Sequence, residues 1–177
     1  MKRSSISKNG STGIATFFKS PVLPVSMSPR SFIHYLNALW VNTEVMLMNT
    51  SHFYLLVSSA TPETDEKRYE KLSRFQRALA MQIVELQRHI ISLDGDPVPR
   101  DQWVTYADLW SIQECNSLPS AWLSLHENAN LLADLYESAL VLSMQQPSRS
   151  DSLYLFAHHL IEINSFLTGP VKANVRN

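Results

Sequence analysis

The sequence predicts an all-α protein in which four helices form a bundle and one long connection separates two helix pairs. Four stretches of roughly 20 to 30 residues carry apolar side chains at spacings of three and four, which is the pattern of helices with one buried face. Prolines, glycines and small polar residues stand at the ends of these stretches. The connection between the second and third stretches is the longest, so it must cross the length of the bundle.

The first helix is predicted to begin at Ser28 and Pro29, a pair typical of an N-cap and a first helical position. Its buried stripe comprises Phe32, Leu36, Leu39, Thr43, Met46, Thr50, Phe53 and Val57. A second stripe at intervals of seven comprises Ile33, Trp40, Leu47 and Tyr54. We therefore expect this helix to be covered on more than one side, by its own bundle and, as one alternative, by a second subunit. A break is predicted over residues 58–64, which include Pro62.

The second helix is predicted from about Asp65 to Leu93, before Gly95, Pro97 and Pro99. Its buried face comprises Leu72, Phe75, Leu79, Ile83, Leu86, Ile90 and Leu93. Residues 96–116 contain too many large apolar side chains for a plain surface loop. A short crossing helix is therefore predicted from Tyr106 to Gln113.

Two further helices follow this connection. The third is predicted to start at Ser117, Leu118 and Pro119 and to end by Pro147, with a stripe of Trp122, Leu125, Ala129, Leu132, Leu135 and Ala139. The fourth starts at Ser150 or Asp151, ends before Gly169 and Pro170, and has a stripe of Leu153, Phe156, Leu160, Ile163 and Leu167. Residues 29–168 thus form the predicted bundle, between tails at 1–28 and 169–177. One long crossover between two tight pairs is the arrangement of ferritin-like folds.

Composition places the chain among ordinary single-domain proteins. It has 177 residues, a formal charge of −1 and 45% hydrophobic residues. No apolar run approaches the roughly 18 to 20 residues that cross a bilayer, so no membrane role is expected. The single cysteine, Cys115, can form neither an intramolecular disulfide nor a cysteine zinc cluster. A reducing compartment, the cytoplasm, is the expected location.

The N-terminal segment is basic. Residues 1–43 contain no Asp or Glu but five cations, at Lys2, Arg3, Lys8, Lys19 and Arg30, whereas the remainder carries 10 basic and 16 acidic residues. Residues 1–28 are rich in Ser, Gly and Pro, and we expect a mobile tail that could contact polyanions such as DNA through Lys2, Arg3 and Lys8. The alternatives are a solvated tail without a partner and a transit-like segment for an organelle.

From about Ser31 to Phe166 the chain resembles the Dps miniferritins, the DNA-binding proteins from starved cells. His52-Phe53-Tyr54 is similar to the family's His-Trp-Asn, and Ile91 to Pro97 is similar to the Leu-Gly-Gly end of its second helix. The fourth helix starts at Asp151-Ser152, as in the family. The resemblance implies a self-assembled shell of twelve subunits that binds Fe(II), oxidises it with hydrogen peroxide or oxygen, stores ferric mineral and protects against oxidative damage.

The resemblance also implies ligand positions for non-haem iron. His52 matches the first ligand, which faces the second helix of a partner subunit. In the second helix the family pattern is Asp-x-x-x-Glu-Arg-x-x-x-Leu-Gly-Gly. Anchored on Gly95 it places the two acidic positions at Glu85 and His89, with Glu70 matching a further ligand; anchored on Leu93 it places them at Val84 and Arg88, which cannot bind iron.

Other interpretations remain open at this stage. His52 could instead be an interface or core histidine, and Glu85 and His89 could form an ordinary polar pair at the edge of the apolar stripe. In the fourth helix His158 and Glu162 lie four residues apart, beside His159, and could bind a metal or simply form a surface pair. At the level of function, the alternatives are a ferritin-like structural or DNA-coating assembly without a working diiron site, and an unrelated helical interaction module.

Overall fold

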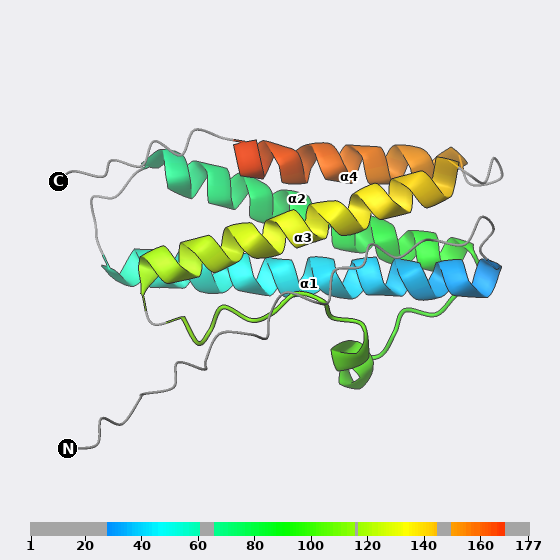
Figure 1. The fold of residues 1–177 in the computed structure, drawn as a ribbon, viewed down its shortest axis with the longest axis horizontal. Coiled ribbons are helices and arrows are strands. Elements are labelled where there is room, and N and C mark those ends of the chain that lie inside the picture. Colours follow the sequence, from blue (N-terminus) through cyan, green and yellow to red (C-terminus); the bar gives the residue numbers. More distant parts are fainter. Residues whose placement is uncertain (1–27, 61–65, 116, 145–149, 169–177) are drawn as a thin grey trace, which may run out of the picture.

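The computed structural model describes residues 28–60, 66–115, 117–144 and 150–168, and the regular secondary structure within these ranges is entirely helical. It contains four long helices, α1 Pro29–Ala60, α2 Glu66–Ser92, α3 Leu118–Met144 and α4 Ser150–Thr168, and one short 3-10 helix, η1 Arg100–Thr105. The predicted four-helix bundle with a crossover between the second and third helices is confirmed (Figure 1). Nearly all of the predicted N-terminal tail, with Lys2, Arg3 and Lys8, and the C-terminal tail 169–177 lie outside the described residues.

The helices pack as two layers of antiparallel neighbours. α1 contacts α2 and α3, and α4 contacts α2 and α3, so α1 lies diagonally across from α4. Figure 1 shows α1 and α4 running in one direction and α2 and α3 in the other, with the crossover returning alongside α1. Because the crossover takes the chain back to the far end of the bundle, α3 can start beside the end of α1.

Serine side chains cap two of the helices. At α1 the Ser28 Oγ accepts a hydrogen bond from the Ser31 backbone N–H at 3.1 Å, which confirms the predicted cap. At α3 the Ser117 Oγ accepts one from the Ser120 N–H at 3.3 Å. These bonds satisfy N–H groups that have no partner inside the helix.

The end of α2 is a Schellman motif. The Gly95 N–H donates to the Ile90 carbonyl at 3.0 Å and the Asp94 N–H to the Ile91 carbonyl at 3.1 Å. The residue in the left-handed region is Asp94, with φ 58°, rather than Gly95. Gly95 is needed for another reason: a Cβ at that position would lie 2.7 Å from Cγ2 of Ile33. Its lack of a side chain lets the turn approach α1.

The core confirms the predicted stripe of α1, where every residue except the half-buried Val57 is buried. In α4 the predicted stripe is fully buried only at Phe156 and Ile163; Leu153, Leu160 and Leu167 are half-buried, and Leu160 and Leu167 pack against the edge of the core. The buried residues of α4 are Ser152, Phe156, His159, Ile163 and Phe166. The two polar residues of this face, Ser152 and His159, are buried because polar side chains of α2 form hydrogen bonds with them.

Outside η1, the crossover is held by buried asparagines rather than by helical hydrogen bonds. The Asn42 Oδ1 accepts from the N–H groups of Asp108 and Leu109, at 2.7 and 3.0 Å, while its Nδ2 donates to the Tyr106 carbonyl at 3.0 Å. Asn37 binds the crossover at Val98, whose N–H donates to the Asn37 Oδ1 at 2.8 Å. These contacts satisfy buried backbone groups that lack secondary-structure partners.

Two more asparagines hold the following segment. The Trp110 carbonyl accepts from Nδ2 of Asn49 at 2.8 Å and from Nδ2 of Asn128 at 2.9 Å. The Asn49 Oδ1 in turn accepts from the Ile112 N–H at 3.2 Å. The prediction of a helix from Tyr106 to Gln113 is therefore wrong: these backbone groups bond to side chains of α1 and α3, and the short helix is η1, which lies before this segment.

The crossover also covers the second apolar stripe of α1. Trp40 is 8% exposed and packs edge-to-face against Trp103 of η1, with ring centroids 5.7 Å apart. At the other end of the stripe Tyr54 is 38% exposed and meets Tyr69 of α2. At Trp40 the cover is therefore the chain's own crossover rather than a second subunit.

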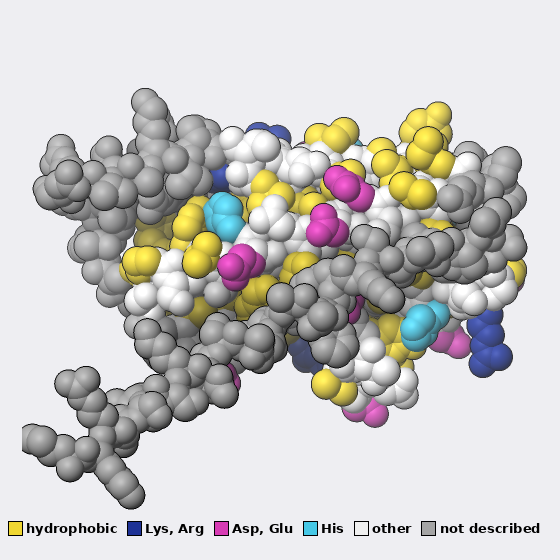
Figure 2. All heavy atoms as spheres, viewed as in Figure 1, with side chains coloured by type: hydrophobic (Ala, Val, Ile, Leu, Met, Phe, Trp, Pro, Cys, Tyr) yellow, Lys and Arg dark blue, Asp and Glu magenta, His cyan; other side chains and the backbone are white. Residues whose placement is uncertain are grey.

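Charge is segregated between the helices. The described side chains of α2 include Lys71, Arg74, Arg77 and Arg88, whereas α3 has no Lys or Arg and exposes Glu127, Asp134 and Glu137. Figure 2 shows acidic side chains along α3 on the face that it presents. Within the described residues, no helix is long and apolar enough to span a membrane.

Candidate metal centre

Two polar pairs join α2 to α4. The His159 Nε2 lies 2.7 Å from the Glu85 Oε2, and the His89 Nε2 lies 2.6 Å from the Ser152 Oγ. Glu85 and His89 are four residues apart, so both project from one side of α2. The same spacing led to the prediction of a shared site for these two residues, but in the structure each contacts its own partner on α4.

His159 is the most constrained member of these pairs. Its side chain is 0% exposed, and the Tyr136 ring packs edge-on against it with centroids 5.4 Å apart. Burial lowers the pKa of His159, and the hydrogen bond and charge of Glu85 oppose this shift without cancelling it. In the neutral imidazole the proton belongs on Nε2, which donates to the carboxylate, while Nδ1 has no hydrogen-bond partner among the described residues.

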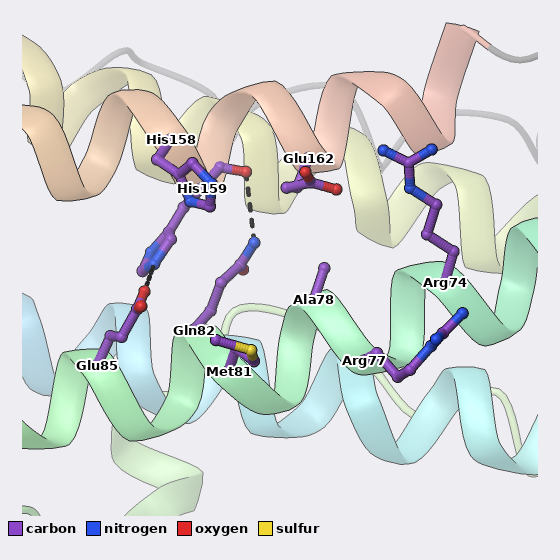
Figure 3. Close-up of a pocket in the computed structure, with 9 residues that line it drawn as sticks. All are labelled: Arg74, Arg77, Ala78, Met81, Gln82, Glu85, His158, His159 and Glu162. Atoms are coloured by element: carbon purple, nitrogen blue, oxygen red, sulfur yellow. Dashed lines mark hydrogen bonds and ion pairs between the residues drawn. The ribbon is translucent and has the colours of Figure 1, made fainter.

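A groove of about 470 Å³ runs between α2 and α4 beside this pair. Glu85, His158 and His159 line one end of it, and Arg74 and Arg77 line the other (Figure 3). In Figure 3 the two arginines extend away from Glu85, with Ala78, Met81 and Gln82 between. The groove therefore opens the Glu85 end to solvent without placing a guanidinium group on it.

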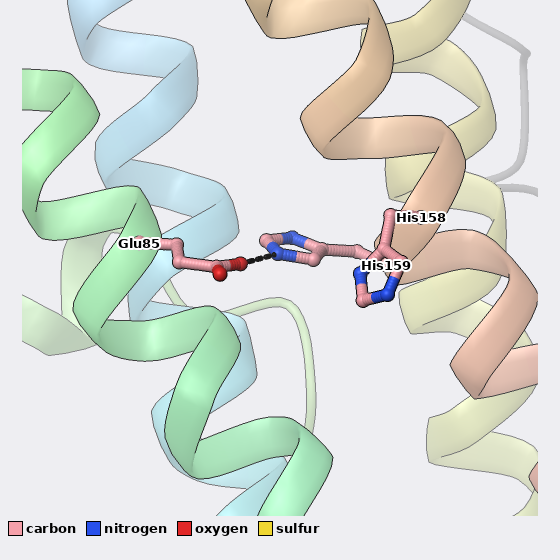
Figure 4. A group of neighbouring side chains, drawn as sticks. All are labelled: Glu85, His158 and His159. Carbon is pink, nitrogen blue, oxygen red and sulfur yellow. Dashed lines mark hydrogen bonds and ion pairs between the residues drawn. The ribbon is translucent and has the colours of Figure 1, made fainter.

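Three side chains at that end converge. Glu85, His158 and His159 each offer one ligand atom, and these atoms all lie within 4.8 Å of one another. Figure 4 shows Glu85 of α2 facing His158 and His159 of α4. The burial is graded, since His159 is buried, Glu85 half-buried and His158 exposed. One carboxylate and two imidazoles at this separation are the donor types that bind first-row transition ions.

The structure places the sequence-predicted ligands at several separate points. Within the described part of one subunit, the group with ligand atoms in reach of one another contains Glu85 but not His52, Glu70 or His89. His52 is half-buried on α1, and Glu70 is exposed near the start of α2. A site that joins His52 of one subunit to Glu85 and His89 of another stays a prediction.

Sequence reasoning paired His158 with Glu162 and missed the convergence of His158, His159 and Glu85. The available signal was the presence of polar residues on the inner faces of both helices. Glu85 and His89 of α2 form hydrogen bonds with polar residues 159 and 152 of α4. Whether such residues meet depends on the register of the two antiparallel helices, which the sequence alone does not give. The apolar stripe predicted for α4 also excluded His159 from the core.

Comparison with known proteins identifies the fold. No protein-family model matches the sequence, and no curated protein matches it. Among solved structures, the X-ray structure of Dps from Thermosynechococcus elongatus matches with a TM-score of 0.67 and 13% identity, covering 78% of this chain and 86% of that chain. A likeness at this identity establishes the architecture, and it confirms the resemblance as a divergent example of the Dps-like fold.

Proposed function

We propose that this chain, which has the Dps-like ferritin-like fold, assembles with copies of itself and sequesters iron. The observation that carries the proposal is the match over 78% of the chain to a Dps structure. Carboxylate oxygen and imidazole nitrogen suit iron, which is the substrate here rather than a resident cofactor.

A strip of α1 supports self-association. Met48 is 46% exposed, Leu55 is 67% exposed, and His52 lies between them on the same side of the helix. Apolar side chains exposed in a row are costly in water and are typical of contact surfaces. In the proposed assembly this strip faces another subunit, which places His52 at the interface, and twelve copies is the number that the resemblance implies.

The proposed chemistry is oxidation of Fe(II) held between subunits. His52 of one subunit and Glu85 and His89 of the other supply the ligands, and Glu70, which lies at the His52 end of α2 and therefore belongs to the same subunit as His52, is a further ligand. Two Fe(II) ions each lose one electron, hydrogen peroxide accepts both, and its O–O bond breaks to give two hydroxide ions. Delivery of both electrons to one peroxide avoids release of hydroxyl radical. The ferric product is then stored as mineral, which limits oxidative damage.

The test measures assembly and oxidation on one sample. Light scattering gives the particle mass, and ferric absorbance after addition of Fe(II) and peroxide gives the oxidation rate. A particle of about twelve subunits that forms mineral faster than buffer supports the proposal. His52→Ala should lower the initial rate and leave the particle mass unchanged, while His34→Ala, which removes an exposed histidine near the start of the same helix, should change neither.

One observation favours a second candidate function, an assembly without a working diiron site. Glu85 already bonds to His159, and the group that contains it has a single carboxylate. Such an assembly would be structural or would coat DNA through the N-terminal tail, because the acidic face of α3 repels a polyanion. A large particle without oxidation would indicate this function, whereas a monomer or dimer without iron uptake would indicate a helical interaction module instead.

A further inference from the structure

The Glu85, His158 and His159 group is built within one subunit, so it does not need the assembly proposed above. Its residues come from α2 and α4, whose backbones are fixed by helical hydrogen bonds and by the packing of the core between them. A site on two packed helices holds its ligands more rigidly than a site on loops. The geometry of this group is therefore a property of the folded bundle.

We infer that these three residues bind a single divalent first-row transition ion in the groove between α2 and α4. The ion takes the place of the proton that the His159 Nε2 shares with the Glu85 Oε2, two atoms already 2.7 Å apart. His158 supplies the third ligand from the exposed side. Two imidazoles and one carboxylate form the ligand set of mononuclear Fe(II) sites and also suit cobalt, nickel and zinc, whereas Mg²⁺ and Ca²⁺ prefer oxygen alone.

The surroundings fit an ion better than a plain hydrogen-bonded pair. A hydrogen-bonded pair with only a structural role would be stabilised by exclusion of solvent. The groove and the exposed His158 instead leave one side of the Glu85–His159 pair open to solvent. That side gives the ion a path of entry and leaves room for water as further ligands. The buried side is closed by Tyr136, whose hydroxyl lies 3.0 Å from the Thr43 Oγ1 and is thus satisfied away from the site.

The site differs from the proposed iron centre in every residue except Glu85. The iron centre needs His52 and a second subunit, whereas this group needs His158 and His159 of the same chain. It holds one ion rather than two, because it offers one carboxylate and two imidazoles. Both sites use Glu85, but His52 belongs to the iron centre alone and His158 to this site alone. Variants of these two histidines therefore distinguish failure of one proposal from failure of the other.

The test uses the full chain without an affinity tag and Co(II) as the probe, because its visible absorption reports imidazole and carboxylate coordination. Titration should give one Co(II) per chain. His158→Ala and Glu85→Gln should each weaken binding by about tenfold or more, since loss even of groups that only support a ligand typically costs about 10- to 100-fold in affinity. Glu162→Gln, a change in the same groove outside the group, should leave the affinity unchanged.

Circular dichroism and melting curves of each variant establish that the bundle is intact; the buried His159 is left in place for this reason. Saturable Co(II) bands at one equivalent that are lost in His158→Ala support the inference. Absence of such bands overturns it, as does unchanged affinity in both His158→Ala and Glu85→Gln. Loss of the bands in His52→Ala with retention in His158→Ala also overturns it, because the ion would then bind between subunits.

Discussion

His159 of α4 and Glu85 of α2 are 74 residues apart in sequence, and their side chains meet at 2.7 Å across the bundle. The imidazole is fully buried, whereas the carboxylate side chain remains 37% exposed. A polar bond at this depth fixes the register of α4 on α2, because a shift by one residue would bury His159 without its acceptor.

The pKa of His159 predicts a loss of stability in mild acid. Burial lowers the pKa of His159 below its ordinary 6.5 despite the carboxylate, so at pH values under 6.5 the unfolded chain binds more protons than the folded one. The contribution of this residue to the free energy of unfolding is therefore complete above pH 6.5 and decreases as the pH falls below that value. Melting temperatures measured between pH 5 and pH 8 should show this decrease.

A variant separates His159 from the other titrating groups. His159→Gln should show a smaller change in melting temperature between pH 7.5 and pH 5.5 than the unaltered chain, although it is less stable throughout. His34→Gln, at an exposed histidine, should keep the full change. The same pH dependence in His159→Gln and in the unaltered chain would assign the acid sensitivity to other groups, such as the half-buried His126.

Asn42→Ala should destabilise the protein by about 3 kcal/mol, because it leaves the buried N–H of Leu109 and the half-buried N–H of Asp108 without an acceptor. Chemical denaturation gives the free energy of unfolding. The matched control is Asn130→Ala, at an exposed position of α3, with an expected effect within about 0.5 kcal/mol. Hydrogen exchange at Asp108 and Leu109 should also accelerate in Asn42→Ala; unchanged exchange would show that water replaces the side chain.

Substitutions at the two residues that end α2 should act in opposite directions. Asp94→Gly should stabilise the protein by about 1 kcal/mol, because Asp94 holds φ 58° and carries negative charge at a helix C-terminus. Gly95→Ala should destabilise it by about 1 kcal/mol or more, because the added Cβ would lie 2.7 Å from Ile33. Equal changes of the same sign in the two melting curves would contradict this account of the turn.

The N-terminal tail should govern any binding to DNA. Deletion of residues 1–20 should abolish a salt-sensitive mobility shift, and replacement of Lys2, Arg3 and Lys8 by Ala should reduce the slope of log K against log salt by about 3. The acidic face of α3 makes that side of the bundle a poor polyanion surface. Retention of the shift after the deletion would place binding on the basic side chains of α2.

The sequence sufficed for the helices because local signals determine them. Ser28 and Pro29 mark the start of α1, and the three-and-four spacing from Phe32 to Phe53 identifies its buried face. The crossover could not be predicted in the same way. Its backbone groups bond to Asn42, Asn49 and Asn128, which are distant in sequence. No residue near Tyr106 therefore indicates that these groups bond to side chains instead of forming a helix.

The candidate site was harder to predict for a related reason. Hydrophobic periodicity assigns Leu160 to the core of α4 and His159 to its edge, because it counts a histidine as polar and therefore exposed. The structure buries His159 completely and leaves Leu160 half-buried against the core, since the polar partner Glu85 offsets the cost of burying His159. Such compensation depends on pairs of residues on different helices, which a single helical pattern does not contain.

The asparagine contacts also set how the crossover tolerates changes in length. From Leu109 to Ile112 three steps of chain cover the distance between Asn42 and Asn49, about 10 Å along α1 at roughly 1.5 Å per residue. Asn49 also donates to the Trp110 carbonyl, so Leu109, Trp110 and Ile112 are each bound to an asparagine of α1, and a deletion between them would detach one asparagine. Asn37 and Asn42 lie about 8 Å apart along α1, and their partners Val98 and Asp108 are ten residues apart in the chain. The residues in excess of that distance form η1. Insertions around η1 should therefore be tolerated, whereas the number of residues from Leu109 to Ile112 is fixed by the contacts of Asn42 and Asn49 at its two ends.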